Sequence, residues 1–110
     1  MPVRDDLLAE RARTVAQIEA LAREFDGIVE AAELVATDDE HDPEGHTIAF
    51  ERQQVAALLR DARSHLGDLD DALARVALGT YGVCASCGRP IAADRLAARP
   101  AARTCIACAH

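Results

Sequence analysis

The sequence predicts a mainly α-helical protein, with a long antiparallel two-helix coiled-coil hairpin over residues 1–78 and a small four-cysteine module over residues 79–110. Two long stretches that repeat apolar residues at helical spacing predict the hairpin. Two closely spaced pairs of cysteines near the end of the chain predict the module. The composition agrees, because 50% of the 110 residues are hydrophobic but only 3% are aromatic, which favours long helices over a large globular core.

The first helix is expected over residues 3–36. Its apolar residues recur every seven positions, with a second set three positions further on, as in a helix that buries one face against another. The main set is Leu8, Val15, Ala22 and Val29, the second set is Ile18, Phe25 and Ala32, and the stripe is widened by Leu7, Leu21, Ile28 and Val35.

The second helix is expected over residues 47–78, where the same pattern recurs and where His65 flanks the apolar stripe. Neither helix can bury its stripe alone, but two helices joined by a short connector can bury their stripes against each other. The main set here is Ile48, Val55, Ala62, Leu69 and Val76, and the second set is Leu59, Leu66 and Leu73.

Residues 37–46, called here the acidic connector, contain five carboxylates and no lysine or arginine. Pro43 and Gly45 are expected to place the turn there, and Thr47 to cap the second helix. Two interpretations remain open. The connector is either a solvated turn or a negatively charged surface displayed at the end of a stiff arm.

The cysteines form two C-x-x-C pairs, Cys84 with Cys87 and Cys105 with Cys108, with 17 residues between the pairs. This spacing is typical of a tetrahedral four-thiolate zinc site, and Gly88 supplies the backbone freedom that the first turn needs. Four protein ligands leave no open position on the metal, so we expect one structural Zn²⁺ ion. A redox-active pair of dithiols is the alternative. Four arginines near the site would offset its negative charge: Arg89, Arg95, Arg99 and Arg103.

The module has few large apolar residues, so metal binding should be coupled to its folding.

Charge is unevenly distributed, since residues 1–80 carry 8 arginines against 18 acidic residues and residues 81–110 carry 4 arginines against one aspartate. The net charge of −7 argues against broad binding to nucleic acid. No catalytic motif, secretion signal or membrane-spanning run is recognised, so a cytoplasmic protein that is not an enzyme is expected.

The C-terminal module resembles the zinc-finger signature of the bacterial DksA/TraR family. The resemblance rests on residues 81–88, on Ile91, on residues 95–100 and on the second cysteine pair, and it places all four cysteines at the family's zinc-ligand positions. It implies a regulator of transcription that binds RNA polymerase, with no DNA contact required. We further expect a monomer that does not associate with a membrane. The coiled-coil arm would enter the secondary channel of the polymerase, often acting together with the alarmone ppGpp.

The resemblance also assigns a role to the acidic connector, whose end would lie near the catalytic centre of the polymerase. The family motif Asp-x-x-Asp-x-Ala corresponds here to Asp39, Asp42 and Glu44, so both acids are kept and the alanine is not. A shifted register would instead use Asp42 and Glu44.

Three other functions fit the same residues. A zinc-stabilised nucleic-acid-binding module would use the arginines of residues 81–110. A protein-interaction or dimerising coiled coil would act without RNA polymerase. A thiol redox sensor would release zinc on oxidation.

Overall fold

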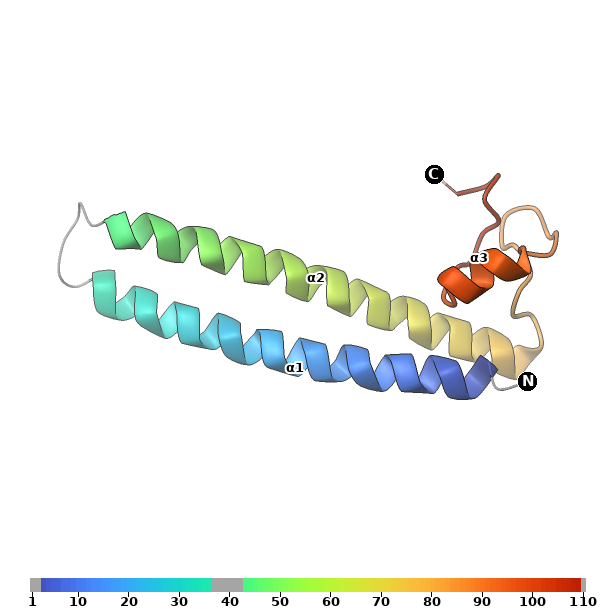
Figure 1. The fold of residues 1–110 in the computed structure, drawn as a ribbon, viewed down its shortest axis with the longest axis horizontal. Helices are drawn as coiled ribbons and strands as arrows, with labels where there is room; N and C mark the ends of the chain where they lie inside the picture. Colours follow the sequence, from blue (N-terminus) through green and yellow to red (C-terminus); the bar gives the residue numbers. More distant parts are fainter. Residues whose placement is uncertain (1–2, 37–42, 110) are drawn as a thin grey trace. The chain divides into compact units, whose positions relative to one another are not determined.

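The computed structural model describes residues 3–36 and 43–109. They form three helices, α1 (Val3–Ala36), α2 (Pro43–Leu78) and α3 (Ala93–Ala98) (Figure 1). One isolated antiparallel bridge joins Val83 to Pro90. The predicted mainly helical fold class is therefore confirmed. None of the described helices combines the length and apolar character needed to cross a membrane.

The chain divides into two compact units, and the second of them, residues 15–63, contains helix alone in its described part. Here the later part of α1 and the first part of α2 lie side by side and run in opposite directions (Figure 1). Their apolar faces enclose a core of their own, as the two matching stripes predict. Its buried residues are Leu21, Val55, Leu59 and Ala62, packed against Ile18, Ala22, Phe25 and Ile28.

The first unit, residues 1–14 and 64–110, joins the start of α1, the end of α2 and all the residues that follow α2. Tyr81 and Ala101, which come from the cysteine-containing segment, contribute to its core. The helical part of this core consists of Leu7, Leu69 and Ala72, with Val3, Leu73 and Val76 packed against them. The cysteine module is therefore built onto the base of the two long helices within this unit.

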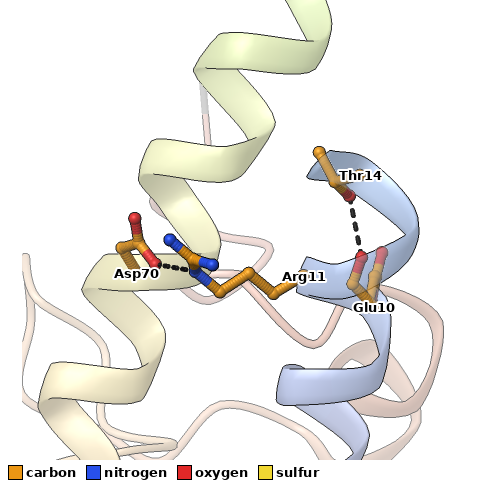
Figure 2. A network of polar contacts seen from close by, with 4 residues as sticks. All are labelled: Glu10, Arg11, Thr14 and Asp70. Carbon is orange, nitrogen blue, oxygen red and sulfur yellow. Dashed lines mark hydrogen bonds and ion pairs between the residues drawn. The ribbon is translucent and has the colours of Figure 1, made fainter. Parts of the chain in front are cut away.

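Polar contacts also join α1 to α2 in the first unit. The Arg11 Nε atom lies 2.6 Å from the Asp70 carboxylate (Figure 2), and His65 Nε2 lies 2.9 Å from the Glu10 carboxylate. The side chains of the Arg11–Asp70 pair are 40% and 50% exposed, so the pair contributes little to stability.

The buried line of α1 differs by one residue from the predicted line. Leu7 is completely buried whereas Leu8 is 38% exposed, and the line continues through Thr14 and Leu21. The sequence pattern did not identify this line because Thr14, in its middle, is polar. Its hydroxyl donates a hydrogen bond to the Glu10 carbonyl at 2.9 Å, so the polar group is satisfied inside the interface (Figure 2). The predicted line of α2 is confirmed at Val55, as well as at Ala62 and Leu69.

Both ends of α2 follow from its sequence, although the start was predicted wrongly. The helix begins at Pro43, before Thr47, so Pro43 does not break it and Thr47 does not cap it. Proline suits the first helical position because the missing N–H has no partner there. The helix ends at Leu78, and the following Gly79 has a φ of +78°, which lets the Thr80 N–H donate to the Arg75 carbonyl at 2.9 Å.

Candidate metal centre

Each cysteine pair lies in a tight turn held by backbone hydrogen bonds. In the first turn, the Gly88 N–H donates to the Cys84 carbonyl at 2.9 Å, and the Cys84 N–H donates to the Arg89 carbonyl at 2.8 Å. Gly88 has a φ of +74°, which confirms the expected need for glycine after the first pair. In the second turn, the Cys108 N–H donates to the Cys105 carbonyl at 3.1 Å.

The two turns bring all four sulfur atoms to within 4.8 Å of one another. A tetrahedral zinc ion with bonds of about 2.3 Å places its sulfurs about 3.8 Å apart. The Sγ atoms of Cys87 and Cys105, one from each pair, are separated by 3.8 Å. The arrangement therefore fits a four-thiolate site that can bind one zinc ion.

The acidities of the thiols show why this cluster suits a divalent cation. Backbone N–H groups, first that of Cys105 and then those of Cys87 and Ser86, lower the pKa of the Cys84 thiol to about 6. The neighbouring sulfurs, Cys105 foremost, raise the pKa of the Cys108 thiol to about 12. The cluster thus favours loss of the first thiol proton and disfavours loss of the last one, which would add a negative charge beside other sulfurs. A bound cation would offset this repulsion and replace the remaining thiol protons.

The segment between the two pairs accepts hydrogen bonds from three other residues. The Ala85 N–H, in the first turn, donates to the Arg103 carbonyl at 2.8 Å. The Tyr81 hydroxyl donates to the Pro100 carbonyl at 2.8 Å, and Arg75 of α2 donates to the Ala102 carbonyl at 3.4 Å. The second cysteine pair is therefore positioned through the residues that precede it.

The arginines expected to offset the charge of the site have different roles. Arg103 forms an exposed ion pair with Asp71 of α2 at 3.4 Å, whereas Arg95 of α3 donates from Nε to the Thr104 carbonyl at 2.9 Å. Arg89 and Arg99 are exposed. Sequence reasoning missed the contacts of Arg75 and Tyr81, since each depends on a tertiary contact that no local pattern reports.

The other predicted residues are placed as follows. Asp39 and Asp42 lie outside the described residues, and Glu44 lies in the first turn of α2. His65, expected beside the packing stripe, is half-buried and contacts Glu10.

Comparison with known proteins identifies the same module. The family model described as the prokaryotic dksA/traR C4-type zinc finger matches residues 79–110. The uncharacterized protein YteA of Bacillus subtilis is 38% identical over 66 residues, which make up 60% of this chain and 28% of YteA. An uncharacterized protein of Aquifex aeolicus is 46% identical over 45 residues, or 41% of this chain and 31% of that protein. The chain thus matches less than a third of the length of either relative.

The similarity to a solved structure extends beyond the zinc finger. The structure of transcription factor DksA2 from Pseudomonas aeruginosa matches with a TM-score of 0.77 and 31% sequence identity, over 96% of this chain and 75% of that one. The match therefore includes the long helices as well as the four-cysteine module. On the fold, the cysteine cluster and these similarities together, the chain belongs to the DksA/TraR family.

Proposed function

We propose that this protein regulates bacterial transcription by binding RNA polymerase through protein contacts and without needing to contact DNA. The similarity to transcription factor DksA2 carries the proposal, because it covers 96% of the chain at 31% identity. The net charge of −10 on residues 1–80 also supports a protein partner over a nucleic acid, whose phosphates such a surface repels.

The zinc ion would be held by Cys84, Cys87, Cys105 and Cys108. With four protein ligands it has no position for water or a substrate, so its contribution is to fold the module. The side chains of the module then hold the base of the two helices through the core shared with Tyr81 and Ala101.

The acidic connector would be the part that acts on the polymerase. A pair of helices is about 20 Å across, which suits a narrow channel that admits nucleotides. Carboxylates brought near a Mg²⁺-bearing active centre would change its electrostatics without being catalytic themselves. We assign this role to Asp39 and Asp42, with Glu44 as the third acidic residue, and we assign ppGpp as a partner that acts at the complex.

Transcription reconstituted from purified polymerase tests the assignment of the connector. The double variant Asp39→Asn with Asp42→Asn should keep its zinc and nearly all of its affinity for the polymerase, yet lose its effect on transcription. The matched control is Asp38→Asn with Glu40→Gln, which removes the same charge from the same segment and should behave like the parent protein.

Two results would contradict the proposal. If the Asp39 and Asp42 variant still alters transcription like the parent protein, or if the control loses the effect equally, the role of these carboxylates is wrong. If the parent protein binds duplex DNA at moderate salt but does not bind the polymerase, a nucleic-acid-binding module replaces the proposed function. Comparing reactions with and without ppGpp tests whether the alarmone acts at the complex.

A further inference from the structure

The second cysteine pair depends on the residues before it for its position. In the described part of the chain, the backbone hydrogen bonds donated by Cys108 and Ala109 both end on the Cys105 carbonyl, within their own turn. The Cys105 N–H lies against the Cys84 thiol, and the other contacts that connect this turn to the rest of the module lie at residues 102–104. The contacts at residues 102–104 therefore help to set where Cys105 meets the metal, and they come from residues that are not metal ligands.

One of the contacts acts on the peptide group that joins Thr104 to Cys105. Arg95 Nε donates to the Thr104 carbonyl at 2.9 Å, and both residues are half-buried. The backbone of Arg95 is itself fixed on α3, since its N–H donates to the Asp94 carboxylate at 2.9 Å and its carbonyl accepts from the Arg99 N–H at 2.7 Å. The backbone that carries this donor is thus held in place, and the hydrogen bond from Nε orients the peptide group that joins Thr104 to Cys105.

A backbone hydrogen bond from the Ala85 N–H to the Arg103 carbonyl, at 2.8 Å, also holds this segment, but the other side-chain contacts of the segment are longer than that of Arg95. The ion pair between Arg103 and Asp71 spans 3.4 Å, and both side chains are more than half exposed, where such pairs contribute little. The Arg75 contact to the Ala102 carbonyl is also long, at 3.4 Å, and lies further from Cys105. Among the side-chain contacts at residues 102–104, the one from Arg95 is the shortest.

We propose that Arg95 is a positioning residue for the zinc site, which holds the Thr104 carbonyl so that the Cys105 thiolate is aimed at the metal and zinc is lost slowly. The inference rests on the proposed binding of zinc by the four cysteines. Groups that orient metal ligands contribute about 10- to 100-fold to metal affinity in other sites, so the effect is large enough to measure.

A purely electrostatic role for Arg95 is the alternative that a test must separate. Zinc with four thiolates carries a charge of −2, and any nearby arginine offsets it. Arg99 provides the matched control, because it lines the same cleft as Arg95 and Cys105 and carries the same charge. Removing Arg99 deletes the charge and keeps the hydrogen bond to the Thr104 carbonyl.

The experiment measures the rate at which full-length, zinc-loaded protein transfers its zinc to an excess of a chromophoric chelator. Arg95→Met keeps the length of the side chain but loses the donor, and it should release zinc about tenfold faster than the parent protein. Arg95→Lys keeps a charged donor on a different stem and should fall between the two. Arg99→Ala and Asp71→Asn should stay within about twofold of the parent protein.

Spectra of the cobalt-substituted proteins give a second readout, because the ligand-field bands of Co²⁺ report the geometry of the thiolates directly. We expect these bands to shift in Arg95→Met and to be unchanged in Arg99→Ala. A general loss of helix would instead change the circular-dichroism spectrum, and it would not distinguish Arg95→Met from Arg99→Ala.

The inference is overturned if Arg95→Met keeps zinc as long as the parent protein, or if Arg99→Ala loses it equally fast. Should Arg95→Met fail to fold, Arg95→Lys must still release zinc faster than Arg99→Ala, and an equal or opposite order overturns the inference. A parent protein that binds no zinc contradicts the proposed metal site as well, whereas zinc-loaded variants that all behave alike contradict only the role of Arg95.

Discussion

The side chain of Tyr81 connects the zinc module to the helices. Its ring packs against the core formed by Leu7 and Leu69, and its hydroxyl donates to the Pro100 carbonyl at 2.8 Å. Burial raises the pKa of this phenol above its ordinary value of 10.0, while the nearby charge of Arg75 partly opposes the shift. One residue therefore holds the segment between the two cysteine pairs onto the end of α2.

Tyr81→Phe should lower the free energy of unfolding by about 1 kcal/mol at neutral pH, because the Pro100 carbonyl loses its partner. In the parent protein the raised pKa means that folding favours the neutral phenol. The associated stability is complete below pH 10 and is lost as the pH rises through the folded-state pKa. The variant should lack this alkaline loss.

The measurement is direct because Tyr81 is the one tyrosine in a chain without tryptophan. Ultraviolet absorbance should show the phenol of the folded protein ionising above pH 10.0, and denaturation should move the midpoint down. A midpoint that is the same in the folded and denatured chains would refute the account of this residue.

At the scale of elements, the sequence predicted the helices better than their exact register. The stripe of α2 was identified correctly at Val55 and Leu69 because apolar residues occupy a single clear line there. In α1, two neighbouring lines are both apolar, and Thr14 made the buried one look polar. Choosing between them requires the partner helix, so local periodicity could not decide.

The candidate site was likewise predicted in part, in its local features but not in its tertiary contacts. The four cysteines and Gly88 were identified from spacing, since a metal-binding turn is a local structure. The contacts of Arg95 and Arg75 were not foreseen, because they join residues that are 9 and 27 positions apart in the sequence. Such contacts depend on how the chain folds back between them, which a local pattern does not report.

The register of α1 can be tested with two adjacent leucines. Leu7→Ala should lower the free energy of unfolding by about 2–5 kcal/mol, because it leaves a cavity in a completely buried position. Leu8→Ala should cost about 1 kcal/mol or less, because the side chain is 38% exposed. Urea unfolding followed by circular dichroism measures both. Equal losses, or a larger loss for Leu8, would restore the register predicted from the sequence.

At the scale of the whole chain, the two compact units differ in their dependence on the metal. In the first unit, Tyr81 and Ala101 share a core with Leu7, Leu69 and Ala72, so disorder of the zinc module removes neighbours from both long helices. The second unit has a core formed by α1 and α2 alone. Zinc binding should therefore stabilise one set of helical turns selectively.

Hydrogen exchange followed by mass spectrometry tests this selectivity. Removing zinc with a strong chelator, or by Cys84→Ser with Cys105→Ser, should speed amide exchange in residues 81–108. It should also speed exchange in the first turns of α1 and the last turns of α2, because their shared core loses two of its members. Residues 18–28 and 55–62 should exchange nearly as in the zinc-loaded protein, since their core contains no residue of the module. Uniformly faster exchange along both helices would show that the two cores are not independent. Unchanged exchange at Leu7 and Leu69 would show that the module contributes nothing to the base of the helices.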